Sequence, residues 1–154
     1  MSELFLILDM AGERVALPAS RVESVVELEG LTPVPGAAPH IAGLAALRSR
    51  VLTVVDPYRV LGDEPPARDG ACEAVVIEWD AHPYALLVDN VHDVAEAPGH
   101  VLPPKATLGR GWPRLSSGMI EVDDRVMLLI DVRAVLSGPD AVGSSLKSLS
   151  TIAA

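Results

Sequence analysis

Two carboxylates are the residues of this chain best suited to acid–base chemistry. Asp56 and Asp131 each end an aliphatic run, and together they resemble a catalytic carboxylate pair. They occupy equivalent places in two similar segments, however, which favours a shared structural task. An aspartate at a strand end can cap the following helical turn, because its side-chain oxygen accepts a backbone N–H. We therefore favour caps, and keep a small hydrolase using Asp56 or Asp131 with a histidine as the weaker alternative.

The other reactive side chains form no cluster with known chemistry. The sequence contains no HExxH, CxxC or His-x-His spacing, so no closely spaced ligand set for zinc is expected. It also lacks a phosphate-binding glycine loop and a nucleophile elbow. We therefore expect no metal, no cofactor and no catalytic residue. The residues considered are the four histidines and the single cysteine: His40, His82, His92, His100 and Cys72.

The chain contains two pairs of similar segments. Residues 43–61 align without a gap on residues 118–136, with identities at Gly43 and Gly118, Arg50 and Arg125, Val51 and Val126, Asp56 and Asp131, Val60 and Val135, and Leu61 and Leu136. A second ungapped match places residues 15–17 on 84–86, Val22 on Val91, Val25 on Val94 and Glu27 on Glu96. Both matches keep the same order in each half. Internal similarity of this kind indicates two related lobes.

The elements that position these residues read mainly as strands. Three hairpins are predicted over residues 4–17, 74–88 and 119–130, each with two aliphatic runs around a polar turn. A lone strand is predicted over residues 51–55, and Val22, Val25 and Val26 fit either a strand or a helical turn. Short helical turns should follow Asp56 and Asp131, with Gly62 and Gly138 at their ends. The sequence therefore predicts an all-β pair of barrels.

Prolines and glycines mark the predicted boundaries. Linkers are predicted at residues 32–39, 63–70, 98–104 and 108–113, and residues 62–70 separate the repeats. The predicted domain spans residues 1–138, with intertwined lobe repeats at about residues 5–62 and 74–137. Residues 139–154 are expected to form a flexible tail or a short docking helix, with Val142, Leu146, Leu149 and Ile152 at helical spacing.

Composition limits the partners and the compartment. Hydrophobic residues make up 49% of the chain but aromatic residues only 3%, so the core must be aliphatic. Lobes this small bury apolar surface poorly alone, and we expect them to lean on each other or exchange a strand. The net charge of −9 opposes binding to nucleic acid and to anionic lipid. The aliphatic runs are too short to cross a bilayer, residues 1–3 lack a basic signal-peptide start, and the single cysteine suits a reducing cytoplasm.

The repeats differ in charge at one turn. Where the second repeat has Val122-Asp123-Asp124, the first has Leu47-Arg48-Ser49. An exposed arginine beside apolar surface is typical of interface anchors, because its planar guanidinium forms several directed bonds. A solvated arginine that balances a nearby acid is an equally good interpretation. The sequence leaves both open.

Four segments carry a recognisable set of motifs. GLAALRSRVLTVVD stands at residues 43–56, PHIA precedes it at residues 39–42, LVDNV stands at residues 87–91, and a closing segment covers residues 118–131. With these motifs the chain resembles the CheW family of chemotaxis coupling proteins over nearly all of residues 4–136. The family motif GxxNLRG, followed by an aliphatic strand and Val-Asp, corresponds to residues 43–56. The family asparagine is Ala46 here and the glycine after the arginine is Ser49, so the geometry of the turn is expected to differ.

The resemblance implies a fold, a function and a set of contact residues. The expected fold is two five-stranded SH3-like barrels, and the expected function is a non-catalytic cytoplasmic adaptor. Its partners would be the cytoplasmic tip of a chemoreceptor and the regulatory domain of a chemotaxis histidine kinase. The implied receptor-binding residues are Val22, Ile41, Gly43, Leu47, Arg48, Val88 and Val91, although Val22, Ile41, Val88 and Val91 would individually also suit the core.

One alternative within the same fold stays open. CheW-like domains also occur as the regulatory domain of the kinase, and this chain would then be a fragment of such a protein. A chain of 154 residues has no room for a phosphotransfer helix, an ATP-binding lobe or a receiver domain. We therefore expect the separate adaptor.

Overall fold

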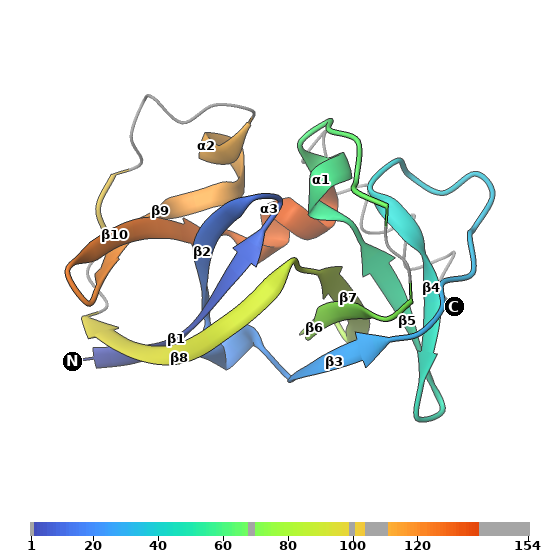
Figure 1. The fold of residues 1–154 in the computed structure, drawn as a ribbon, viewed down its shortest axis with the longest axis horizontal. Helices are drawn as coiled ribbons and strands as arrows, with labels where there is room; N and C mark the ends of the chain where they lie inside the picture. The colour runs from blue at the N-terminus through green and yellow to red at the C-terminus, as the bar shows by residue number, and fades with distance from the viewer. Residues whose placement is uncertain (1, 68–69, 99–100, 104–110, 139–154) are drawn as a thin grey trace.

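Ten strands form two five-stranded sheets within the part of the chain that the computed structural model describes, residues 2–67, 70–98, 101–103 and 111–138 (Figure 1). The first sheet has the order β8 (Asn90–Pro98), β1 (Ser2–Met10), β2 (Glu13–Pro18), β10 (Arg125–Ile130), β9 (Ser116–Val122). The second has the order β3 (Ser24–Leu28), β6 (Cys72–Trp79), β7 (His82–Leu87), β5 (Arg50–Val55), β4 (Ile41–Leu47). Each sheet curls into one lobe.

The two repeats exchange a hairpin. The β1–β2 hairpin of the first repeat lies in the sheet that holds β8, β9 and β10, whereas the β6–β7 hairpin of the second repeat lies with β3, β4 and β5. The parallel contacts that join each hairpin to its sheet are also equivalent: Leu128 pairs with Val15 in one lobe, and Thr53 pairs with Tyr84 in the other. Each lobe therefore needs strands from both halves of the chain.

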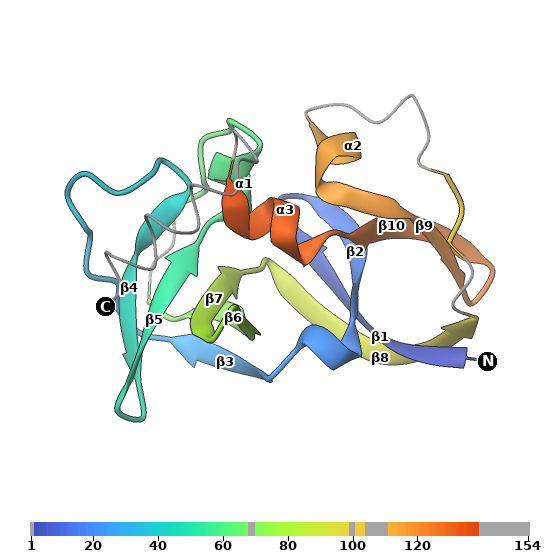
Figure 2. The same cartoon turned by 180° about the vertical axis from the view of Figure 1, so that it is seen from behind.

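The described residues also form four short helical segments: η1 (Ala19–Arg21), α1 (Pro57–Val60) and α2 (Trp112–Leu115), which lie between strands, and α3 (Val132–Ser137), which follows β10. The predicted caps are confirmed. The Asp56 side chain accepts a hydrogen bond from the Tyr58 amide at 3.0 Å, and the Asp131 side chain accepts one from the Ala134 amide at 3.3 Å. Figure 2, which shows the molecule from behind, places α3 across the middle of the molecule, between the two lobes.

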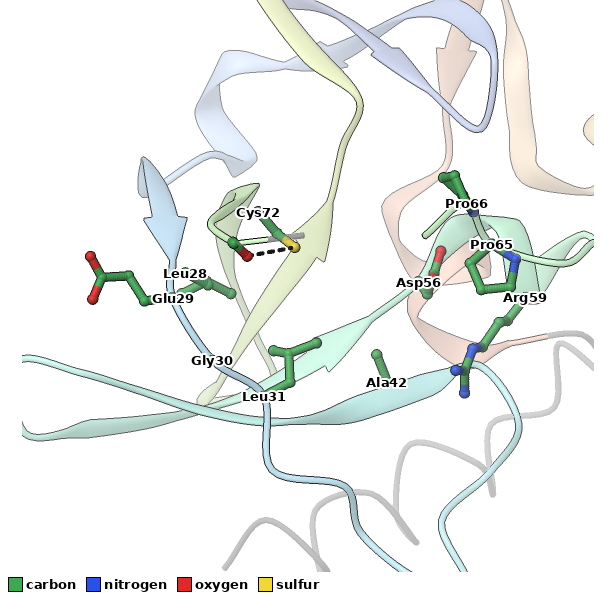
Figure 3. A pocket seen from close by; sticks show the side chains of 11 residues that line it. Leu28, Glu29, Gly30, Leu31, Ala42, Asp56, Arg59, Pro65, Pro66 and Cys72 are labelled. Atoms are coloured by element: carbon green, nitrogen blue, oxygen red, sulfur yellow. Dashed lines mark hydrogen bonds between the residues drawn. The ribbon is translucent and has the colours of Figure 1, made fainter. Parts of the chain in front are cut away.

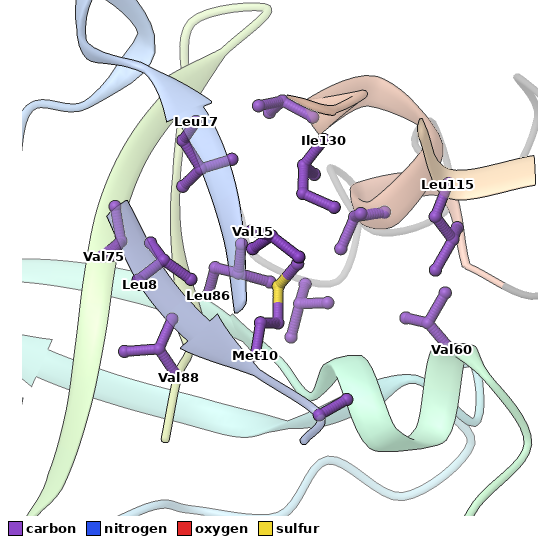
Figure 4. Close-up of a cluster of buried hydrophobic side chains, with 14 of the residues drawn as sticks. Leu8, Met10, Val15, Leu17, Val60, Val75, Leu86, Val88, Leu115 and Ile130 are labelled. Carbon is purple, nitrogen blue, oxygen red and sulfur yellow. The ribbon is translucent and has the colours of Figure 1, made fainter. Parts of the chain in front are cut away.

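Among the described residues, three clusters of mainly aliphatic side chains form the core. The largest lies between the lobes, and Figure 4 shows side chains from β1, β2 and β10 meeting those from β6 and β7. A smaller cluster fills each barrel. Both faces of the central strands are thus covered, which explains their unbroken aliphatic runs. The predicted burial is confirmed: Val54 and Val55 are 0% exposed, Ile130 is 2% exposed and Leu129 is 7% exposed.

Some predicted elements need correction. The three hairpins are present, but residues 51–55 are not a lone strand, because β5 pairs antiparallel with β4 over Ile41–Leu47. That segment is rich in alanine and glycine, which are uncommon in strands, so its pattern was weak. The ambiguous valine segment is strand β3 preceded by η1. The predicted linker at residues 108–113 overlaps α2, which begins at Trp112, a residue only 3% exposed.

The predicted tail over residues 139–154 lies outside the described residues. None of the helices that the described residues form has the length and apolar character needed to span a bilayer.

Candidate protein-interaction surface

The predicted anchor, Arg48, stands on the exposed turn between β4 and β5. Arg48 has φ of 49° and Ser49 has φ of 72°, and two consecutive left-handed residues are typical of a type I′ turn. The preceding Leu47 is half-buried and packs against the apolar cluster inside the barrel. The turn therefore presents the guanidinium to solvent from a backbone that the hairpin holds in place.

An ion pair ties this hairpin to a neighbouring strand. The Arg50 guanidinium lies 2.9 Å from the Glu23 carboxylate, just before β3. The two side chains are 44% and 39% exposed, so the pair contributes little to stability, about 0–1 kcal/mol. Its consequence is geometric, because it places the base of the Arg48 turn beside the start of β3.

The equivalent turn of the other lobe has the same backbone and the opposite charge. Asp123 and Asp124, between β9 and β10, have φ of 49° and 66°. Ser49 thus adopts the left-handed conformation even though the family motif has glycine there. The two turns of this chain therefore share left-handed φ values and differ in charge. A difference from the glycine-containing turn of the family stays a prediction.

Four of the predicted contact residues lie in or against the core between the lobes. Ile41 is 6% exposed and Val88 is 5% exposed, and both belong to that core. Val22 and Val91 are half-buried and pack against it. Only the latter two present side-chain surface to a partner in this conformation.

Two exposed valines extend this region outward. Val25 on β3 is 42% exposed and Val94 on β8 is 51% exposed. Val25 pairs with Val75 and Val94 pairs with Leu6, and both partners face the core between the lobes. Directly paired residues share a sheet face, so the two valines lie where that core opens to solvent. We call Val22, Val25, Val91 and Val94 the valine surface; in Figure 1, β3 and β8 run along the lower part of the two lobes.

The sequence contained a signal for this surface that the site prediction did not use. The repeat alignment pairs Val22 with Val91 and Val25 with Val94. Equivalent positions of a duplicated fold share an environment, so choosing Val22 and Val91 already pointed to Val25 and Val94.

Gly43 has a structural task beside the Arg48 hairpin. Its φ is 154°, and a Cβ placed there would lie 2.6 Å from the backbone oxygen of Thr32. Gly118, its equivalent, has φ of 143°, and a Cβ there would lie 2.4 Å from the backbone oxygen of Leu102. At both positions another strand-like segment crosses too closely for a side chain.

A pocket of about 410 Å³ opens between the edge strands of the second lobe (Figure 3). Leu28, Leu31 and Ala42 line one side of it, and Asp56 and Arg59 lie toward the other. Asp56 is only 1% exposed, and its carboxylate caps α1. Among the described residues, no three histidine, cysteine or acidic side chains are grouped so that they could hold a metal ion.

A charged cluster lies on the first lobe, where β1, β2 and β8 meet. The Asp9 carboxylate lies 2.8 Å from His92 Nε2 and 3.2 Å from Arg14 Nε. Partial burial opposes ionisation of Asp9, but the hydrogen bonds from His92 and Arg14 outweigh it and lower the pKa of this carboxyl. The cluster joins three strands of the lobe.

The CheW-like domain family model matches residues 4–140. The chain belongs to the CheW-like family. A probable chemotaxis protein CheW from Rhizobium etli is 27% identical over 120 residues, covering 75% of this chain and 77% of the relative. The chemotaxis protein CheW of Thermotoga maritima is 24% identical over 127 residues, covering 80% and 81%.

The fold of a solved CheW structure matches as well. The scaffolding protein TtCheW from Thermoanaerobacter tengcongensis superposes with a TM-score of 0.73 at 21% identity, covering 86% of each chain. The predicted all-β fold of two five-stranded SH3-like barrels is confirmed.

Proposed function

We propose that this protein is a non-catalytic cytoplasmic adaptor that couples chemoreceptors to a chemotaxis-type histidine kinase. Membership of the CheW-like family and the names of its relatives supply the class of function. The observation that carries the proposal is Arg48, an exposed cation on a fixed hairpin turn, where the equivalent turn of the other lobe carries two acids.

Receptor binding is assigned to the Arg48 turn and the valine surface. The cytoplasmic tip of a chemoreceptor is helical, and an amphipathic helix binds by placing spaced apolar side chains in a groove. Val25 and Val94 would contact such side chains, while Arg48 would fix the register through directed bonds to an acidic group. The Arg50–Glu23 ion pair supports this assignment, because it holds the turn beside the strand that carries Val25.

The residues implied by the family resemblance divide into two groups under this proposal. Leu47, Arg48, Val22 and Val91 have exposed or half-buried side chains and can reach a partner. Ile41, Gly43 and Val88 are buried and would act by supporting the surface from beneath. The kinase regulatory domain would occupy a different face, so that both partners bind at once.

The environment of the two aspartates supports a non-catalytic role. Asp56 and Asp131 use side-chain oxygens to cap α1 and α3, which is the task expected of equivalent positions. A hydrolase that depends on Asp56 would lose turnover in Asp56→Asn, whereas the adaptor would keep its partner binding.

The proposal is tested by reconstitution from purified components. The protein is mixed with a receptor cytoplasmic fragment, with the kinase, and with both, and complexes are separated by size-exclusion chromatography. We expect a binary complex with each partner and a ternary complex with both. Failure to bind either partner would overturn the adaptor assignment, and binding only the receptor would favour the fragment alternative.

A further inference from the structure

The two halves of the duplicated fold differ at Asp89, whose carboxylate has no equivalent in the other half. The Asp89 carboxylate, between β7 and β8, accepts a hydrogen bond from the Gly12 amide at 2.9 Å. It also accepts one from the Tyr58 hydroxyl, at 3.1 Å to Oδ1 and 3.2 Å to Oδ2. These bonds join the β1–β2 turn, helix α1 and the crossover between the lobes.

The equivalent place in the other half has no such carboxylate. The repeat alignment places Ser20 on Asp89, Ala81 on Gly12 and Arg133 on Tyr58. Serine supplies no carboxylate, and the tyrosine hydroxyl is replaced by an exposed guanidinium. In this half, the Arg133 guanidinium is a stronger hydrogen-bond donor to an anion than the Tyr58 hydroxyl is, but the chain supplies no carboxylate in the place of Asp89.

A groove of about 180 Å³ lies next to this position, and Arg133 is among the residues that line it. One part of the groove is lined by Arg21, which follows Ser20, and by Trp79, which precedes the β6–β7 turn. Another part is lined by Ile130, Val132 and Arg133. Helix α3, which begins at Val132, lies on the face seen in Figure 2, next to the β6–β7 hairpin. The volume is below the roughly 300 Å³ of typical small-molecule pockets. It suits one or two inserted side chains.

The groove is cationic on an acidic protein. The guanidinium carbon of Arg21 lies 5.0 Å above the Trp79 ring, which orients this cation while its N–H groups stay available. Within the described part of the chain, neither Arg21 nor Arg133 forms an ion pair. The groove's own carboxylate, Asp131, is engaged in capping α3. Arginine N–H groups match carboxylates in geometry as well as in charge.

We propose that this groove binds an acidic side chain from an exposed peptide segment of a protein partner. The guest carboxylate would take the place that Asp89 holds in the other half, between Arg21 and Arg133. An adjoining apolar side chain of the guest would rest on Trp79, Ile130 and Val132. The site lies apart from the Arg48 turn and the valine surface, and it does not depend on the proposed receptor contacts.

The first test uses the full chain labelled with ¹⁵N and two short probes, acetyl-Leu-Glu-Leu-amide and acetyl-Leu-Gln-Leu-amide. We expect the glutamate peptide to shift the Trp79 indole N–H and the Ala81 amide in a saturable, millimolar titration. The glutamine peptide should bind at least about fivefold more weakly, because it lacks the charge-assisted bonds. Equal shifts with both peptides would overturn the proposal. Equal shifts with inorganic phosphate would show a general anion site and overturn the peptide assignment.

Two variants and one control complete the test. S20D supplies the carboxylate from within the chain, so it should abolish peptide binding and leave the thermal midpoint unchanged or higher. R133Q should weaken binding by about fivefold or more. R59Q, at an exposed arginine on the equivalent helix α1, is the matched control and should bind as the unmodified protein does. Binding that survives in both S20D and R133Q would refute the site, and a dispersed spectrum for each variant shows that it is folded.

Discussion

Replacing Gly43 or Gly118 with alanine tests how closely the duplicated lobes are built. A Cβ at Gly43 would lie 2.6 Å from the Thr32 oxygen, and a Cβ at Gly118 would lie 2.4 Å from the Leu102 oxygen. Both neighbours are backbone atoms, so they cannot move aside by a rotamer change. Overpacking costs about 1–3 kcal/mol and an unfavourable backbone region about 1–3 kcal/mol, so each variant should lose about 2–6 kcal/mol of unfolding free energy.

The assay is urea denaturation followed by fluorescence, with thermal melting in parallel. A loss of this size should lower the thermal midpoint by roughly 4–24 °C for a domain of this length. Gly30→Ala is the matched control, since a Cβ there meets nothing within 4 Å and its φ is not positive. Gly12→Ala separates the cost of the backbone conformation from the cost of the steric clash, because the φ of Gly12 is 85° but the space around it is open.

The comparison has a clear contrary outcome. If Gly43→Ala or Gly118→Ala loses no more stability than Gly30→Ala, the close crossing of strands at these glycines is wrong. If the losses equal that of Gly12→Ala, backbone conformation alone explains the two glycines and the steric argument fails.

Three further predictions concern stability. Ile130→Ala should cost about 2–5 kcal/mol by urea denaturation, the usual range for a buried isoleucine, and a loss below about 0.5 kcal/mol would contradict its burial. Ser49→Gly should stabilise the protein by about 0.5–1 kcal/mol, because it relieves a left-handed φ at some cost in chain entropy, and a lower melting temperature would contradict the turn assignment. Because the folded-state pKa of Asp9 is lowered, its carboxylate stabilises the fold at pH values above 3.8, the ordinary pKa of this group. This contribution is lost as the pH falls through the lower folded-state pKa. Asp9→Asn should therefore make stability fall less steeply below about pH 4; an unchanged acid limb would contradict the ion cluster.

Local patterns predicted the parts of the fold that local chemistry determines. The hairpin turn at Asp123 and Asp124 and the caps at Asp56 and Asp131 follow from short-range backbone preferences, and all are present. Strand β4 was not predicted from the sequence, because its alanines and glycine have little preference for strands. Its pairing with β5 and its burial in the barrel decide its conformation.

Local patterns could not predict the exchange of hairpins between the lobes or the burial of the site residues. The repeat alignment identifies equivalent segments, but it does not state which copy each segment pairs with; tertiary packing decides that. Ile41 and Val88 are aliphatic residues in a chain where both faces of the central strands are covered, so their type did not separate core from surface. The exposure of Arg48 was easier to predict, because Arg48 lies just before the predicted strand at residues 51–55 and aligns with the polar turn at Asp123 and Asp124 in the other repeat.

The central claim is that Arg48 anchors a partner without stabilising the fold. The most direct measurement is the affinity of Arg48→Glu for the receptor fragment and the kinase in the three-component assembly, with a melting curve beside it. We expect receptor binding to weaken by about 2 kcal/mol or more, roughly 30-fold, because directed bonds are lost and a like charge faces an acidic group. The unfolding free energy should change by less than about 0.5 kcal/mol, and Asp123→Arg, at the equivalent turn, should leave receptor binding intact. Unmodified assembly by Arg48→Glu would contradict the anchor, and a collapsed melting curve would show that Arg48 is structural instead.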